Sequence, residues 1–274
     1  MNQPTLAFIG AGNMSQAIFG GLIKQGYDAG NIWGSTRTPA TLQYLQDTFG
    51  IRTSTDNREL IRHADVIILG VKPQGMQALL TELADELQER RPLLISVAAG
   101  ITVEALDRWS GGGLPIIRCM PNTPSLVGTG ASGLYANGTV SPQQRDIADN
   151  IFAAIGIASW VDQESLIDAV IAVSGSGPAY YFMMMEAMIA AGEKLGLSRQ
   201  SATELTLQTA LGAARMAQHS DVDAGELKRR VMSPGGTTEQ AVLSFEQAGL
   251  SQLVEAAMTR CYDRAGEMAE ELTK

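Results

Sequence analysis

The feature that most constrains the fold is a regular alternation of short apolar runs with amphipathic segments, which extends to about residue 161. The apolar runs predict buried strands at residues 6–9, 32–34, 66–70, 93–97 and 116–119. Helical patterns separate them, at residues 15–25, 39–49, 74–89 and 102–109. Strict alternation of strand and helix predicts βαβ units and therefore a parallel sheet. Two further strands, at residues 134–136 and 157–161, would enclose a helix at residues 142–154.

The pattern changes after residue 162, where strand-like runs end and long helical patterns begin. Helices are expected at residues 164–173, 178–195, 199–219, 224–232, 238–247 and 251–273. Pro178 suits a first helical turn, Gly196 a helix C-terminus and Ser198 an N-cap. The sequence therefore predicts an α/β domain at residues 1–162 and an all-α domain at residues 163–274.

Composition and isolated residues exclude several classes of protein. The chain is 45% hydrophobic and 18% charged, with a formal net charge of −9, whereas a nucleic-acid binder needs a basic face. The cysteines Cys119 and Cys261 and the histidines His63 and His219 lie far apart, so we expect neither a disulfide framework nor a metal site. The N-terminal stretch does not resemble a signal peptide, and no apolar run approaches the ~20 residues of a membrane span. A cytoplasmic protein with no membrane partner is expected.

A glycine-containing loop follows the first predicted strand directly. Gly10 permits a tight turn, Gly12 lets the backbone approach a diphosphate, and the next helix would point its free N–H groups at that anion. Ser15 replaces the third glycine of the dinucleotide-binding pattern and is still small enough for close packing. The position between a strand and a helix favours a Rossmann-type site over a glycine turn without a ligand.

The segment after the second strand favours NADP(H). NAD enzymes usually carry an acidic residue there, but this chain has Ser35, Thr36, Arg37 and Thr38. Three hydroxyls and a guanidinium suit a 2′-phosphate, so we expect NADPH, with NADH as the alternative. Ser35 and Thr38 could instead only cap the next helix.

Two more loops follow strands and could reach a ligand. Lys72 and Pro73 come after the third apolar run, where a loop can cross the nicotinamide ribose, although Lys72 could also be an ordinary surface lysine. Residues 120–124 are too proline-rich for a helix and would form a stiff loop at the carboxyl end of a strand, where ligands gather in this architecture.

The helical half contains a second glycine cluster, at residues 233–238. Thr237 as N-cap and Gln240 would form a capping box, leaving the hydroxyl of Thr238 to point elsewhere. The N–H groups of this helix start would suit a carboxylate, although a plain turn between helices is the alternative. The methionines at positions 183, 184, 185 and 188 are typical of a core or a dimer interface.

Together these segments resemble the pyrroline-5-carboxylate reductase family. The similarity runs through nearly the whole chain, in the family's order, in the stretches FIGAGNM, GVKPQ, SVAAGI, RCMPNTP, LIDAV, SGSGPAY and VMSPGGTTEQAV. It implies NAD(P)H-dependent reduction of L-1-pyrroline-5-carboxylate to L-proline, the last step of proline biosynthesis. It also implies a Rossmann domain, a helical dimerisation domain, and a homodimer or decamer with substrate sites near the dimer interface.

The resemblance further implies which residues form the site. For the cofactor these are Ile9, Gly10, Ala11, Gly12, Asn13, Met14, Ser35, Thr36, Arg37, Asn57, Gly70, Val71, Lys72, Pro73, Val97, Ala98, Ala99 and Asn122. For the substrate they are Glu164, Ser176, Ser233, Gly235, Gly236, Thr237 and Thr238. Thr238 would hydrogen-bond the ring nitrogen and act as the catalytic residue, and the N–H groups of Gly236 to Thr238 would bind the substrate carboxylate.

Two other functions are weighed against this one. A β-hydroxyacid dehydrogenase needs a lysine acid/base on the helix after residue 176, but the first lysine there is Lys194, at the far end. A regulator that binds NADPH without turnover would show a degenerate substrate loop, and residues 233–238 show no such degeneration.

Overall fold

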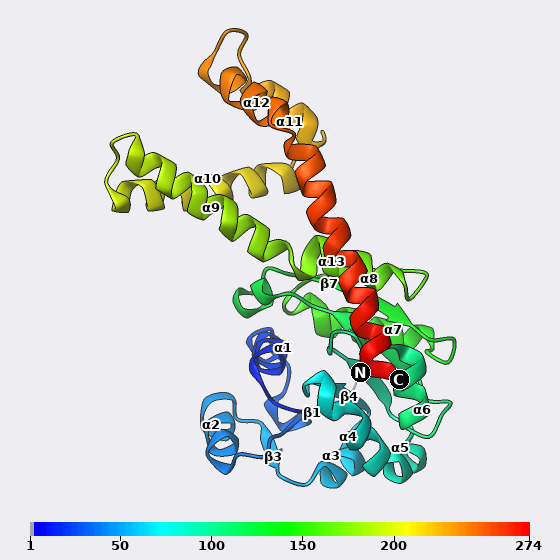
Figure 1. The fold of residues 1–274 in the computed structure, drawn as a ribbon. Coiled ribbons are helices and arrows are strands. Elements are labelled where there is room, and N and C mark those ends of the chain that lie inside the picture. The colour runs from blue at the N-terminus through cyan, green and yellow to red at the C-terminus, as the bar shows by residue number, and fades with distance from the viewer. Residues whose placement is uncertain (1–2) are drawn as a thin grey trace. The chain divides into compact units, whose positions relative to one another are not determined.

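The computed structural model describes residues 3–274 and contains an eight-stranded sheet in the order β3-β2-β1-β4-β5-β6-β7-β8 (Figure 1). Neighbouring strands are parallel except for β6 and β7, which are antiparallel. The strands are β1 (Leu6–Ile9), β2 (Ile32–Ser35), β3 (Arg52–Ser54), β4 (Val66–Leu69), β5 (Leu93–Ser96), β6 (Ile116–Met120), β7 (Gly130–Ala136) and β8 (Gly156–Trp160). The predicted fold class, a mostly parallel Rossmann-type sheet followed by helices, is confirmed.

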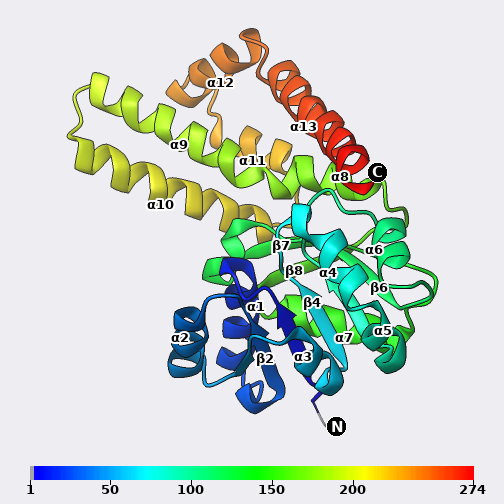
Figure 2. The ribbon, with the colours of Figure 1, turned by 60° about the horizontal axis from the view of Figure 1, so that its bottom comes forward.

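Helices cover both faces of the sheet. One face packs under α1 (Asn13–Lys24), α2 (Pro39–Phe49) and α7 (Pro142–Ala153), which enclose Phe8, Phe19 and Phe152 in one core. The other packs under α3 (Asn57–His63), α4 (Met76–Glu82), α5 (Ala84–Arg90) and α6 (Val103–Trp109). Figure 2 shows α4, α5 and α6 together on one side of the strands. The strands β1, β4 and β5 are buried along their whole length and almost entirely apolar, because each of their faces meets a layer of helices.

Two short elements and one helix break were not predicted. The strand β3 is only three residues long and reads Arg-Thr-Ser at the sheet edge, so it carries no apolar signal. The helix α3 follows it and is also short. The single helix predicted at residues 74–89 is a 3-10 turn (Pro73–Gly75) followed by α4 and α5, which are separated at Leu83. Leu83 is buried, with φ −102° and ψ 6°, so the chain bends while keeping this leucine in the core.

The chain divides into two compact units, Met1–Ser176 with Cys261–Lys274, and Gly177–Arg260. The first unit therefore includes the sheet, α8 (Leu166–Val170), a π-helical turn (Ile171–Gly175) and the last part of α13 (Leu250–Thr273). In this unit a Cβ at Gly100 would lie 2.8 Å from Leu272, which shows how closely α13 packs there. The domain boundary at residue 162 follows the end of the strands and stays a prediction.

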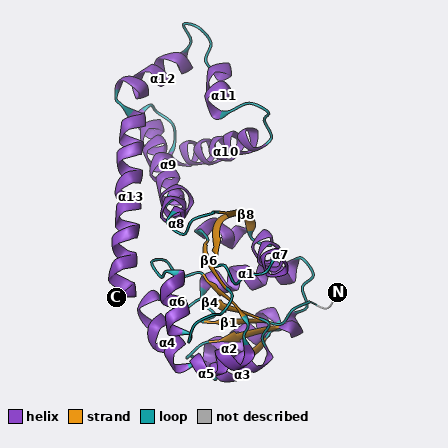
Figure 3. Cartoon of the chain, turned by 90° about the vertical axis from the view of Figure 1, so that its right-hand side faces the viewer, coloured by secondary structure: helices purple, strands orange, loops and turns teal. Residues whose placement is uncertain are grey.

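The second unit contains α9 (Gly177–Lys194), α10 (Arg199–Gln218), α11 (Ala224–Val231), α12 (Thr237–Gln247) and the start of α13 (Figure 3). The helices α9 and α10 pack closely, because a Cβ at Gly192 would lie 3.1 Å from the Cβ of Ala202. Ser198 caps α10 by accepting from Ser201 N–H, as predicted, and Gly196 has φ +101° just after α9. Large apolar side chains remain exposed on α9, among them Tyr181, Phe182 and Met183.

The described part of the chain contains neither a candidate membrane span nor a candidate metal-binding cluster. No helix in residues 3–274 is long and apolar enough to span a membrane. No three His, Cys, Asp or Glu side chains in that range are grouped so that they could hold a metal ion.

Candidate functional site

The strand order reverses between β1 and β4, and the two loops that leave the carboxyl ends of these strands diverge there. The chain leaves β1 for α1 on one face of the sheet and leaves β4 toward α4 on the other. Gly10 has φ +91°, and a Cβ on it would lie 2.8 Å from the carbonyl carbon of Gly70. The buried Ser15 hydroxyl donates to Gly10 O at 2.8 Å. Glycine is therefore required at both strand ends, and open α/β sheets bind ligands at such a switch point.

The loop after β1 leaves backbone donors at the start of α1. Gly10 N–H and Ala11 N–H donate to Ser35 O, and Gly12 N–H donates to Gly10 O. The first N–H bonded within the helix is that of Gln16, which donates to Gly12 O at 2.9 Å. The N–H groups of Asn13 and Met14 therefore precede the internal ladder. A Cβ on Gly12 would meet no heavy atom within 4 Å, so this approach is open. These features fit the diphosphate of a dinucleotide.

The end of β2 brings hydroxyls and one cation next to the glycine loop, whose Gly10 and Ala11 N–H groups donate to Ser35 O. The Ser35 hydroxyl donates to Asn57 Oδ1 at 2.6 Å, so two predicted adenosine-side residues are in contact. Arg37 is exposed and takes part in none of the ion pairs found among residues 3–274. Thr38 occupies the N-cap position of α2 without a side-chain hydrogen bond. Neither hydroxyl therefore accepts a capping hydrogen bond from α2, although Thr38 is its N-cap residue.

The remaining strand ends bring the other predicted cofactor residues to the same edge of the sheet. Val71, Lys72 and Pro73 follow β4, and Lys72 is exposed. Val97, Ala98 and Ala99 follow β5, where Val97 N–H donates to Leu69 O at 3.2 Å. The parallel register of β1, β4 and β5 therefore places these loops beside the glycine loop.

Asn122, after β6, joins two other segments. Its Oδ1 accepts from Ala131 N–H at 2.9 Å, and its Nδ2 donates to Ser174 O at 3.0 Å. The side chain is buried and holds the π-helical turn near β7. The expectation that residues 120–124 could not enter a helix is wrong for residues 123 and 124. A 3-10 helix spans Thr123–Val127, with a proline in its first turn. Proline fits there because the first N–H groups of a helix need no internal acceptor.

Glu164 lies in a buried ionic cluster that sequence reasoning missed. Its Oε1 accepts from Val103 N–H at 2.8 Å and from Arg118 Nη1 at 3.0 Å. Arg118 is 3% exposed, and its Nη2 lies 3.6 Å from Asp168 Oδ1. Burial raises the pKa of Asp168, Arg118 opposes this shift and Glu164 adds to it. The signal for the cluster was an arginine inside the apolar strand IIRCM, since an arginine is almost never fully buried without a partner.

Ser176 lines a small apolar cavity of about 250 Å³ with Ala99, Gly100, Ile171, Cys261 and the first-unit part of α13. Its N–H donates to Ile171 O at 2.8 Å, which closes the π-helical turn. Its hydroxyl lies 3.2 Å from Cys261 Sγ. A larger cavity of about 740 Å³ lies along α1 and includes none of the predicted site residues. The structure thus brings Ala99 and Ser176 together in the smaller cavity.

The loop at residues 233–238 belongs to the second unit and differs in detail from the expectation. The N-cap of α12 is Gly236, so Thr237 is the first helical residue and the predicted Thr237–Gln240 capping box is wrong. Glu239 instead reaches back to accept from Gly235 N–H at 2.8 Å. Gly236 N–H is already used, because it donates to Ser233 O at 2.9 Å. The N–H groups left for an anion are therefore those of Thr237, Thr238 and Glu239, since the internal ladder begins with Gln240 N–H, which donates to Gly236 O.

Comparisons with known proteins decide the family. A family model described as pyrroline-5-carboxylate reductase dimerisation matches residues 164–268. A second model, NADP oxidoreductase coenzyme F420-dependent, matches residues 5–100. The chain is 50% identical over 272 residues to the pyrroline-5-carboxylate reductase of Pseudomonas aeruginosa, covering 99% of both chains. This chain belongs to the pyrroline-5-carboxylate reductase family. The resemblance found in the sequence is thereby confirmed.

Solved structures of the family agree with this assignment. A pyrroline-5-carboxylate reductase from Coxiella burnetii is 43% identical, has a TM-score of 0.94 and is covered over 100% of both chains. A pyrroline carboxylate reductase from Plasmodium falciparum, solved with NADP bound, is 30% identical with a TM-score of 0.86 and covers 98% of this chain and 99% of its own. The fold of this chain is therefore that of the family over its full length.

Proposed function

We propose that this protein reduces L-1-pyrroline-5-carboxylate to L-proline with NADPH as the preferred cofactor and NADH as the alternative. The observation that carries the proposal is the open approach over Gly12 to the free N–H groups at the start of α1, which fits a dinucleotide, in a chain whose relatives over 99% of its length are pyrroline-5-carboxylate reductases. The preference for NADPH rests on Arg37, which is exposed and has no ion pair in the described chain.

The cofactor would lie along the carboxyl edge of β1, β2, β4 and β5. Its diphosphate would meet residues Ile9 to Met14, and its 2′-phosphate would meet Ser35, Thr36 and Arg37, with Asn57 on the adenine side. Gly70 to Pro73, Val97 to Ala99 and Asn122 would line the nicotinamide half. The Ser35–Asn57 hydrogen bond at 2.6 Å supports this assignment because it fixes both side chains before a ligand binds.

The substrate would be held by Glu164, Ser176 and the loop from Ser233 through Gly235 and Gly236 to Thr238. Its carboxylate would accept from the N–H groups of Thr237 and Thr238, which begin α12, where the helix dipole favours an anion. When bound, the nicotinamide supplies the hydride that reduces the imine carbon. The Thr238 hydroxyl would hydrogen-bond the ring nitrogen and orient it, which lets a proton reach this nitrogen through water. No strong acid is needed, because a protonated imine is already electrophilic.

The helical unit would form a homodimer, which could assemble further into a decamer. The exposed apolar side chains of α9 support this, since contiguous apolar surface on a helix usually marks an interface. We also propose a cytoplasmic enzyme without nucleic-acid partners, from the net charge of −9 and the absence of a predicted disulfide framework.

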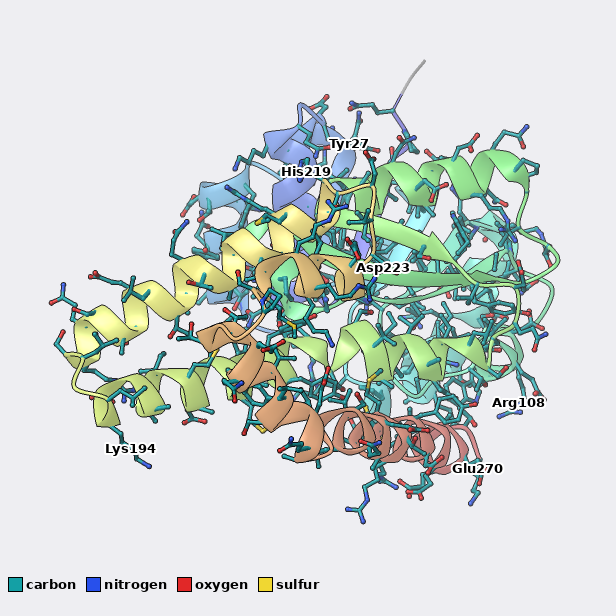
Figure 4. All side chains as sticks on the ribbon, turned by 90° about the horizontal axis from the view of Figure 1, so that it is seen from above. Tyr27, Arg108, Lys194, His219, Asp223 and Glu270 are labelled. Atoms are coloured by element: carbon teal, nitrogen blue, oxygen red, sulfur yellow. The ribbon has the colours of Figure 1, made fainter. Side chains whose placement is uncertain are left out.

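The arrangement of α9 speaks against β-hydroxyacid dehydrogenase chemistry. That reaction needs a lysine near the start of this helix, but Lys194 is at its last residue (Figure 4). The start of α9 carries Gly177 and Pro178 instead.

The proposal is tested by mixing the purified protein with pyrroline-5-carboxylate and following nicotinamide absorbance, first with NADPH and then with NADH at equal concentration. Rapid NADPH loss with proline as product supports it. Faster loss with NADH would keep the reaction and overturn the reading of Arg37. No loss with either cofactor, despite tight NADPH binding, would favour another imine or hydroxyacid substrate, or a sensor.

A further inference from the structure

The buried guanidinium of Arg118 links three segments that the proposed function places around the nicotinamide and the substrate. Arg118 lies on β6, in register with Ser96 of β5, the residue before Val97. Its Nη1 donates to Glu164 Oε1 at 3.0 Å, and the same oxygen accepts from Val103 N–H at 2.8 Å. Val103 is the first residue of α6, so this oxygen holds the end of the turn that starts at Val97.

The second half of the guanidinium faces α8. Arg118 Nη2 lies 3.6 Å from Asp168 Oδ1, and both atoms are buried without a hydrogen-bond partner among the described residues. Asp168 is in α8, which leads directly into the π-helical turn and Ser176. One side chain thus connects β6, the β5–α6 turn and α8, and Asn122 follows two residues after the end of β6 at Met120.

The burial of Arg118 makes this connection rigid. Its side chain is 3% exposed, against 24% for Glu164 and 15% for Asp168. An exposed ion pair can change partners in water, whereas a buried guanidinium that loses its carboxylate is left as an unpaired charge. Arg118 therefore holds Glu164 Oε1 where it accepts from Val103 N–H, at the end of the turn at residues 97–102.

We propose that Arg118 is a positioning residue, which acts through Glu164 to fix the turn at residues 97–102 for hydride transfer. This inference rests on the proposed function, because that function places Val97 to Ala99 beside the nicotinamide and Glu164 beside the substrate. Arg118 itself touches neither ligand in this account. A small displacement of reacting groups is costly, since about 1 Å can lower the rate about 100-fold.

The test compares the variants Arg118→Met, Arg118→Lys, Glu164→Gln and Arg118→Met with Glu164→Gln. Arg90→Met is the matched control, because Arg90 forms an exposed ion pair with Asp65 just before β4, at the opposite edge of the sheet. For each variant we would measure the NADPH dissociation constant, kcat, KM for pyrroline-5-carboxylate, and the kinetic isotope effect with NADPH deuterated at the transferred position.

The expected result for Arg118→Met is a kcat about 10- to 100-fold lower, with the NADPH dissociation constant within about twofold of wild type. The isotope effect should rise, since hydride transfer becomes slower than the other steps. Adding Glu164→Gln to Arg118→Met should lower kcat little further, because both substitutions break the same contact between Arg118 and Glu164. Arg118→Lys should restore part of kcat, and Arg90→Met should match wild type.

Hydrogen exchange provides a readout that does not depend on turnover. In Arg118→Met, or in Arg118→Lys if the methionine variant does not fold, the amides of residues 97–103 should exchange faster, while those of α1 should not change. If wild type itself does not reduce pyrroline-5-carboxylate, the proposed function fails, and exchange still tests the contact. The inference is overturned by unchanged exchange at residues 97–103, by a kcat within twofold of wild type in a folded Arg118→Met, or by fully multiplicative losses in the double variant.

Discussion

Replacing Gly12 with alanine should weaken cofactor binding while leaving the fold nearly intact. The residue has φ −79°, and a Cβ on it would meet no heavy atom within 4 Å. The methyl group therefore strains nothing in the protein. Gly12 is the N-cap of α1, where alanine is less favourable than glycine, so the stability lost should be less than about 1 kcal/mol.

The cost appears when a diphosphate approaches the start of α1. The methyl group would hold the anion away from the N–H groups of Asn13 and Met14, and a hydrogen bond to a charged group contributes about 1.5–3 kcal/mol. Losing one such bond raises the NADPH dissociation constant about 10- to 150-fold. Fluorescence titration with NADPH measures this change, and urea unfolding measures the stability.

Alanine substitutions at two further glycines provide controls for Gly12→Ala. Gly138→Ala is the matched control, because Gly138 is exposed, has open space around it and lies outside the glycine loop. It should leave both quantities unchanged. Gly10→Ala should destabilise the fold itself, since Gly10 has φ +91° and its Cβ would lie 2.8 Å from Gly70; the backbone conformation alone costs about 1–2 kcal/mol. A Gly12→Ala variant that binds NADPH as wild type does would refute the reasoning about the glycine loop.

Three other changes test separate parts of the account. Arg37→Ser should raise KM for NADPH at least about tenfold and leave KM for NADH unchanged in steady-state assays, because only NADPH has the 2′-phosphate; equal changes for both cofactors would contradict the assignment. Thr238→Ala combined with Thr237→Ala should lower kcat/KM about tenfold, the effect of one lost hydrogen bond of about 1.4 kcal/mol, and full kcat/KM would rule out the proposed role of the Thr238 hydroxyl. Asp168→Asn should flatten the pH dependence of stability in urea unfolding series that start at the ordinary aspartate pKa, about 4, and run to higher pH. Burial raises the pKa of Asp168 in the folded state, so its contribution is present below the ordinary aspartate pKa and lost as the pH rises through the raised value. An unchanged slope in Asp168→Asn would show that another group titrates there.

The sequence predicted the elements whose apolar pattern is strong. The buried strands β1, β4, β5 and β6 lie within a few residues of their predicted bounds, because burial makes each of them an apolar run. The long helices α9 and α10 do so because Pro178, Gly196 and Ser198 mark their ends. The edge strand β3 was missed because Arg52, Thr53 and Ser54 carry no apolar signal. The break at Leu83 was also invisible, since a leucine there suits either one continuous helix or two.

In the candidate site, the backbone features could be predicted from the sequence, but the side-chain contacts could not. The glycine loop was predictable because Gly10 and Gly12 stand between a strand and a helix, where backbone requirements are local. The cap of α12 was predicted at the wrong residue, because Thr237 and Gly236 both suit the pattern and only the path of Glu239 to Gly235 N–H distinguishes them. The cluster of Arg118, Glu164 and Asp168 joins residues up to 50 positions apart, so no sequence motif contains it.

The central claim is the reduction of an imine carbon by a hydride from the cofactor. Its most direct test is mass spectrometry of the product formed from pyrroline-5-carboxylate and NADPH that carries deuterium at the transferred position. The account predicts L-proline with one deuterium on the carbon that was double-bonded to nitrogen, formed by wild type and much more slowly by Thr238→Ala with Thr237→Ala. A folded protein that binds NADPH and yields no deuterated proline would contradict it.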